Sequence, residues 1–166
     1  FAVAGGNATV GGVANWGGET RGQGAVFDEI VAHLEAFDAI APYPGRYAHF
    51  SKTCNRVFDH EILAVVMQEM LARHGVRVLL HTRFVDARVG DGGEISHALV
   101  CGVSGPEVLR ARVFIDATGE GQVAHAAGFA TVKGRSGDGL QLPPSLMFFV
   151  RELAEAPKPQ LPEGWF

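Results

Sequence analysis

Small residues directly follow an apolar run in the segment 113–121, which reads Val-Phe-Ile-Asp-Ala-Thr-Gly-Glu-Gly. The apolar run predicts a buried strand, and a short helix is expected to begin just after Gly121. Small side chains let a main chain lie against a flat ligand, and the free N–H groups at a helix start favour an anionic or oxygen-rich partner. The same pattern is also typical of a plain strand-to-helix turn, which uses Gly and Thr for its geometry alone.

A second glycine-rich segment, residues 5–12, reads Gly-Gly-Asn-Ala-Thr-Val-Gly-Gly. The glycines expose the backbone for close approach of a ligand, and Asn7 and Thr9 add side chains that form hydrogen bonds. Taken alone, the segment predicts either a ligand-contacting loop or a flexible stretch near a chain end.

Polar residues able to act on a substrate gather before the second predicted helix: Arg46, His49, Lys52, Arg56 and His60. An Arg binds a carboxylate through two parallel hydrogen bonds, and a His moves a proton near neutral pH. Structural roles compete with these, because His60 at a helix start could cap the helix and His49 could serve packing. Arg46, His49 and His60 are therefore named as catalytic candidates, and the catalytic residue itself is left unassigned.

The two cysteines, Cys54 and Cys101, lie far apart and form no Cys-x-x-Cys pair. A disulfide framework and a metal site are therefore not expected, and a reducing, cytoplasmic compartment is predicted. The first residues carry neither a basic region nor a long apolar run, so a signal peptide and a membrane span are not expected. A formal net charge of −4 gives no electrostatic reason for nucleic acid or an anionic membrane as a partner.

Hydrophobic periodicity and turn residues predict the elements that position these segments. The clearest helix spans about 59–74, with Asp59 as N-cap and Gly75 as the stop. An apolar run at 76–80 is typical of a strand buried on both faces, so this helix and strand form half of a βαβ crossover. The other predicted elements are a helix at 26–37, a meander of strands at 84–89, 95–103 and 108–115, a short helix at 122–127 and a strand at 146–150.

These segments, in this order, resemble the FAD-dependent oxidoreductase family with the glutathione-reductase-like FAD-binding fold. That family has a Gly-Gly-x-x-Thr loop, then a helix and strand, a β-meander and an Asp-Ala-Thr-Gly-Asp/Glu-Gly motif, and residues 5–9 and 116–121 match the two motifs. The segment 138–149 is similar to the family's entry into its substrate domain. The resemblance covers nearly the whole chain.

The resemblance implies FAD as the cofactor. Residues 5–9 are expected along the ribityl chain and flavin, and residues 84–85 are expected to present main-chain groups to the adenine. Residues 117–119 are expected to pack on the adenosine half, and residues 120–122 to face the cofactor from the helix start. The cofactor-binding residues implied in this way are Gly5, Gly6, Asn7, Ala8, Thr9, Phe84, Val85, Ala117, Thr118, Gly119, Glu120, Gly121 and Gln122.

The expected fold class is α/β: a partial Rossmann-like FAD-binding domain with parallel strands, an appended three-stranded antiparallel meander and the start of a substrate domain. The expected units are a flavin-contact loop (1–25), a helical and loop insertion (26–58), an FAD-binding core (59–130) and the start of a truncated substrate domain (131–166). The sequence lacks the family's G-x-G-x-x-G turn, which supplies the pyrophosphate site. We therefore interpret it as an internal fragment that does not hold FAD tightly and is inactive alone.

The leading functional hypothesis is an FAD-dependent oxidoreductase that transfers hydride or electrons between a small organic substrate and flavin, with an unknown electron acceptor. One alternative is a non-catalytic nucleotide-binding or interaction domain on the same scaffold, because fold does not fix function. Another is a flavoprotein-like enzyme of cofactor biosynthesis or RNA modification, although the net negative charge argues against an RNA substrate.

Overall fold

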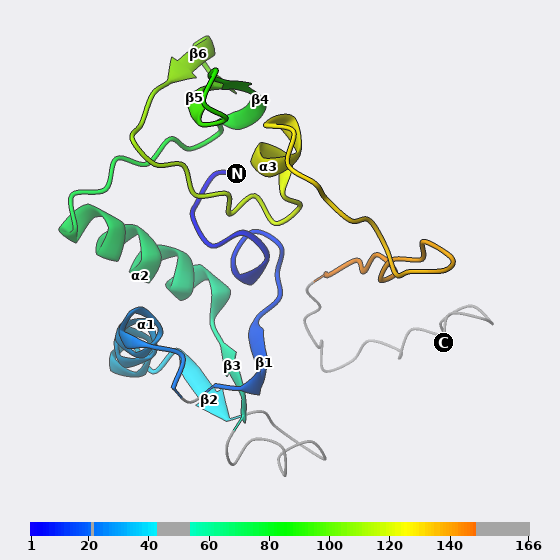
Figure 1. The fold of residues 1–166 in the computed structure, drawn as a ribbon. Helices are drawn as coiled ribbons and strands as arrows, with labels where there is room; N and C mark the ends of the chain where they lie inside the picture. Colours follow the sequence, from blue (N-terminus) through cyan, green and yellow to red (C-terminus); the bar gives the residue numbers. More distant parts are fainter. Residues whose placement is uncertain (21, 43–53, 149–166) are drawn as a thin grey trace.

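The computed structural model describes residues 1–20, 22–42 and 54–148. Its regular structure consists of two three-stranded sheets and three α-helices (Figure 1). In chain order the elements are a 3-10 turn (Gly6–Ala8), β1 (Asn15–Glu19), α1 (Ala25–Ala36), β2 (Ile40–Pro42), β3 (Cys54–Phe58), α2 (His60–Arg73), β4 (Arg83–Val89), β5 (Ile95–Gly102), β6 (Gly105–Leu109) and α3 (Gln122–Ala126).

The first sheet has the strand order β1–β3–β2, and both outer strands are antiparallel to β3. Trp16 of β1 ties this sheet to α1. Its ring lies 4.3 Å from the ring of Phe58 in β3 and 4.8 Å, edge to face, from the ring of Phe27 in α1, measured between centroids. Trp16 is therefore a packing residue that joins β1, β3 and α1.

The hydrophobic core joins α1, α2 and the end of β3. Leu34 of α1 and Leu63 and Val66 of α2 are at most 1% exposed. The buried positions Leu63, Val66 and Met70 recur at the three- and four-residue spacing that places side chains on one face of a helix. Ala8 packs against the same cluster, so the core also fixes the N-terminal glycine-rich loop on α2.

The ends of α2 confirm the prediction made from its caps. The Asp59 carboxylate accepts hydrogen bonds from the N–H groups of Glu61 (2.9 Å) and Ile62 (3.1 Å). Gly75 follows the helix with φ of 67°, in the left-handed region that glycine adopts without strain. These signals are local in sequence, which is why they located the helix to within about one residue.

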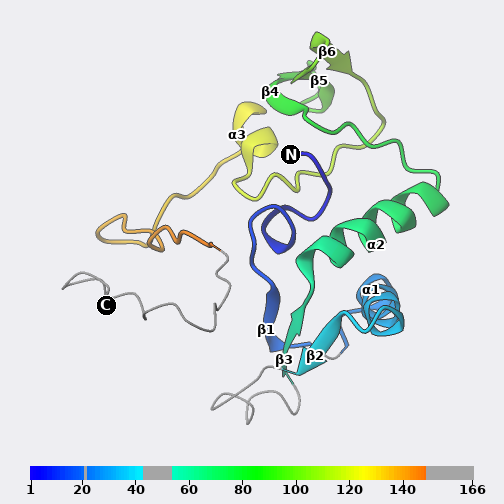
Figure 2. The same cartoon turned by 180° about the vertical axis from the view of Figure 1, so that it is seen from behind.

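The predicted meander is also confirmed, with strand order β4–β5–β6 and antiparallel pairing throughout. The pairing of β4 with β5 shifts between Phe84 and Asp86, so Val85 lies in a bulge. The third strand ends at Leu109 and does not continue to residue 115 as predicted. The meander sits at the opposite end of the molecule from α1 and the first sheet (Figure 1 and Figure 2).

The parallel strands of the expected Rossmann-like domain are not shown by the described residues, whose sheets are both antiparallel. Residues 76–80 and 110–115 form no strand. Most of their apolar side chains are exposed, Val76 by 48%, Val113 by 74% and Ile115 by 87%, whereas Phe114 is half-buried. A strand needs a neighbouring strand whose backbone N–H and C=O groups pair with its own. The apolar pattern of a segment does not show whether such a neighbour exists. The strand predicted at 146–150 is likewise not formed over residues 146–148, and its last two residues lie outside the described ranges.

Three strands were not predicted, namely β1, β2 and β3. The loop expected up to residue 24 contains β1, and the insertion expected at 26–58 contains β2 and β3. Their sequences include Gly, Pro and Asn, which are rare in strands, so local propensity pointed to loops. Pairing around β3 and packing against α1 and α2 override this propensity.

Replacing Val66 by Ala is expected to lower the free energy of unfolding by about 2 kcal/mol relative to Val65→Ala, through lost apolar burial and a residual cavity. Val66 is 1% exposed and the neighbouring Val65 is 49% exposed on the same helix. Both changes replace Val by Ala in the same helix and bring the same gain in helix propensity. The difference in unfolding free energy between the two variants therefore reports the effect of burial. Urea unfolding followed by circular dichroism measures it, and equal stabilities would contradict the packing of α2 described above.

Candidate functional site

The loop of residues 5–12 is a hydrogen-bonded turn. Gly5 and Gly6 have φ of 106° and 53°, values that favour glycine. The N–H of Ala8 donates to the carbonyl of Gly5 (3.1 Å), and the N–H of Gly11 donates to the carbonyl of Gly6 (3.0 Å). The loop therefore gets its shape from its own main chain.

Thr9 supports this loop from the inside. Its side chain is 2% exposed, and its hydroxyl donates a hydrogen bond to the carbonyl of Ala4 (2.8 Å). A Cβ on Gly5 would lie 2.5 Å from Thr9 Cγ2 and 3.0 Å from the sulfur of Met67 in α2. Gly5 is thus required by packing within the protein.

The outer side of the same loop is formed by Gly6 and Asn7. A Cβ on Gly6 would meet no atom within 4 Å, and Asn7 is exposed. Of the predicted residues 5–9, these two are therefore the best placed to approach a ligand, whereas Ala8 packs on the core.

The second loop, residues 117–123, is closed by the carboxylate of Asp116. Its Oδ1 accepts hydrogen bonds from the N–H (3.0 Å) and the hydroxyl (2.8 Å) of Thr118, and its Oδ2 accepts one from the N–H of Ala124 (2.9 Å). The Thr118 hydroxyl accepts in turn from the N–H of Gln122 (2.9 Å). We call these four hydrogen bonds the Asp116 clasp.

The donors of the clasp lower the pKa of the Asp116 carboxyl below its ordinary value of 3.8; the N–H of Ala124 has the largest effect, followed by the N–H and hydroxyl of Thr118. Asp116 was not among the predicted site residues. A signal for it was present in the sequence, because an Asp two residues before a Thr is typical of a turn in which the Asp side chain binds the backbone.

The outer face of the second loop is open main chain. Gly119 and Gly121 have φ of 84° and 65°, and a Cβ on either would meet no atom within 4 Å. Residues 117–120 are exposed, and the side chains of Glu120 and Gln122 are bonded to each other (3.0 Å). Such a surface fits a flat, oxygen-rich ligand such as FAD, because no side chain stands between it and the backbone.

Two of the predicted cofactor segments, residues 84–85 and residues 120–122, meet at β4. Phe84 and Val85 belong to this strand, and Val85, at the bulge, has no pairing partner in β5. The carbonyl of Phe1 accepts a hydrogen bond from the N–H of His81 (2.9 Å), which ties the start of the chain to the segment entering β4. Helix α3, whose first two residues end the second loop (residues 117–123, hereafter the Asp116 loop), packs against β4. Both views place the two loops in the middle of the molecule, between α2 and the meander (Figure 1 and Figure 2).

The structure places few of the catalytic candidates. Arg46, His49 and Lys52 lie outside the described residues. Arg56 is half-buried in β3, opposite Trp16 of β1, and the half-buried His60 is the first residue of α2. Both belong to the α1–α2 end of the molecule, whereas the Asp116 loop adjoins the meander (Figure 1).

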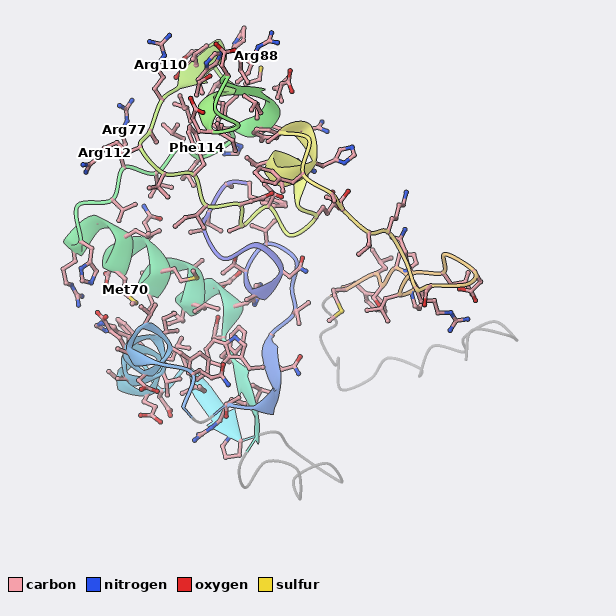
Figure 3. The ribbon with its side chains drawn as sticks, in the orientation of Figure 1. Met70, Arg77, Arg88, Arg110, Arg112 and Phe114 are labelled. Atoms are coloured by element: carbon pink, nitrogen blue, oxygen red, sulfur yellow. The ribbon has the colours of Figure 1, made fainter. Side chains whose placement is uncertain are left out.

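Two clefts lie along the meander. The larger, of 430 Å³, is lined by residues of the β4–β5 turn, by the segment 111–114 and by Phe129, and the smaller, of 110 Å³, lies on the face of the meander that carries Asp86, Arg88 and His97. Figure 3 shows Arg112, which lines the larger cleft, on the same side of the molecule as Arg77. Neither lining includes a residue of the two glycine-rich loops, so these clefts are separate from the candidate site.

Over residues 1–20, 22–42 and 54–148, no cluster of three or more His, Cys, Asp or Glu side chains is arranged to hold a metal ion. Within the same ranges, no helix combines the length and the apolar character needed to cross a membrane. Cys101 is a free, exposed thiol in β5.

A family model described as FAD dependent oxidoreductase matches residues 1–162. The matched range includes both glycine-rich loops, the helices and the meander. No curated protein and no solved structure gives a match.

The Asp116 clasp is expected to open in acid. Because hydrogen bonds lower the pKa of Asp116 in the folded chain, its ionised form stabilises the loop above the ordinary value of 3.8, and this contribution is lost as the pH falls through the folded pKa. Carbon-13 NMR of the Asp116 carboxyl should give a midpoint below 3.8. Thr118→Val should raise this midpoint, and Thr118→Ser, which keeps the hydroxyl, should leave it in place. The same midpoint in both variants would contradict the clasp.

Proposed function

This chain belongs to the FAD dependent oxidoreductase family, and from this premise we propose that it transfers hydride or electrons between FAD and a small organic substrate. FAD is the cofactor of the family, and membership supports a flavin-linked redox role in general terms. The observation that supports the finer proposal is the open main-chain surface of the Asp116 loop, with Gly119 and Gly121 free of neighbours on the outer side. The helix α3, in which this loop ends, packs against β4.

Three segments would hold FAD. Gly6 and Asn7 would approach the flavin and ribityl chain, with Thr9 supporting their loop from behind. The unpaired main chain at the Val85 bulge would bind the adenine through its N–H and C=O groups, since the extra residue of a bulge leaves the strand ladder. The segment 117–122 would pack on the adenosine half, with no Cβ between the ligand and its two glycines.

Bound FAD would supply the redox chemistry, and the residues of the chain would bind and orient the cofactor and substrate. Arg56 is a candidate for binding a substrate carboxylate, because a guanidinium forms two parallel hydrogen bonds with that group. His60 is a candidate for moving a proton near neutral pH. Arg46, His49 and Lys52 remain candidates on the basis of the sequence alone. The electron acceptor is proposed to be a separate molecule.

Purification of the complete gene product that contains these residues tests the proposal directly. We expect flavin absorbance in the visible range, released as FAD on denaturation, and loss of this absorbance when the reducing substrate is added without oxygen. A protein that carries no flavin and takes up no added FAD would overturn the proposed function.

Gly119→Ala is expected to weaken FAD binding about tenfold, equivalent to about 1.4 kcal/mol, because a methyl group would stand on the surface that contacts the cofactor. Gly93→Ala in the β4–β5 turn is a matched control. Gly93 has φ of 85° against 84° for Gly119, and both have open surroundings, so the backbone strain is the same. Fluorescence titration with FAD measures both affinities. Equal weakening by the two changes would place the cofactor away from Gly119.

A further inference from the structure

We propose that Asp116 is a positioning residue for FAD: its carboxylate fixes the shape of the loop 117–123, against which the cofactor binds, without itself contacting the cofactor. The inference rests on the proposed function, because it assigns FAD to this loop. It adds a residue that lies outside the set expected to contact the cofactor.

The two carboxylate oxygens of Asp116 bind groups that lie far apart along the loop. Oδ1 holds Thr118, two residues further along the chain, and Oδ2 holds the N–H of Ala124, eight residues further along. One side chain therefore grips both ends of the loop. The Thr118 hydroxyl extends this grip to the N–H of Gln122, the first residue of α3.

Little besides Asp116 orders the exposed part of the loop, residues 117–120. Glycine loses more conformational freedom on ordering than other residues, and the loop contains Gly119 and Gly121. Residues 117–120 are exposed, so apolar packing contributes little there. The helix α3 has 5 residues, far shorter than a helix that is stable by itself in water. Hydrogen bonds to Asp116 therefore hold the exposed part of the loop, and the packing of α3 against β4 holds its far end.

The Asp116 carboxylate already has partners within the protein. Asp116 is half-buried, whereas residues 117–120 are exposed. Its oxygens accept three hydrogen bonds, two from Thr118 and one from Ala124. A carboxylate turned toward the diphosphate of FAD would also be repelled by its negative charge. The carboxylate is therefore placed to shape the loop and not to bind the cofactor.

The test compares the unaltered full-length protein with Asp116→Asn. The Asn side chain has the same shape, but it has one oxygen and cannot accept from both Thr118 and Ala124. Without FAD, amide hydrogen exchange should become faster at Thr118, Gln122 or Ala124. We expect about a tenth of the variant molecules to hold the loop 117–123 in the geometry that binds FAD. The dissociation constant for FAD should then rise about tenfold.

Asp138→Asn is the control, because Asp138 also accepts a backbone hydrogen bond, from Leu140, and pairs with Arg135 outside the loop. This variant should bind FAD like the unaltered protein. Unchanged FAD affinity or unchanged amide exchange in Asp116→Asn would overturn the positioning role. Unaltered protein that binds no FAD would overturn the proposed function and the inference with it, so the two failures are distinguishable.

Discussion

Burial of the apolar face of α2 is the interaction on which the rest of the described structure depends. Leu63 and Val66 on this face contact Leu34 of α1, and the same cluster receives the end of β3. The face also carries Met67, against which Gly5 packs closely. One helix therefore positions the first sheet, α1 and the N-terminal glycine-rich loop, and the loop cannot be considered independently of the core.

Glycines with positive φ occur in both glycine-rich loops, but their surroundings differ. At Gly5 a side chain would also collide with Thr9 and Met67, so packing inside the protein requires glycine as well. At Gly119 and Gly121 the surroundings are open, and glycine is required by the positive φ of the backbone. The first loop is thus held by the core beneath it, and the second by hydrogen bonds to the side chain of Asp116. A ligand that touches both would rest on one surface fixed by burial and another fixed by a single carboxylate.

Features encoded over a few residues were predictable from the sequence. The N-cap Asp59, the stop at Gly75 and the turns of the meander located α2, β4 and β5 closely, because each signal acts on its immediate neighbours. The strands around β3 were not predictable, since residues such as Pro42 and Gly17 argue against strands and only pairing at long sequence separation stabilises them. In the site, the small residues of the second loop were predicted from the sequence because of their residue types. The role of Asp116 was not, because it depends on a hydrogen bond from the N–H of Ala124, eight residues further along, which residue types alone do not indicate.

The exposed apolar runs at 76–80 and 113–115 have a consequence for the behaviour of concentrated solutions. Valine, leucine and isoleucine side chains in contact with water, next to peptide groups outside any sheet, are the combination that recruits strands from other molecules. Arg77 lies within the first run, and Arg110 and Arg112 precede the second, with Arg77 and Arg112 on one side of the molecule (Figure 3). Charges beside such runs oppose intermolecular β-pairing, and these arginines have the placement of gatekeepers against it.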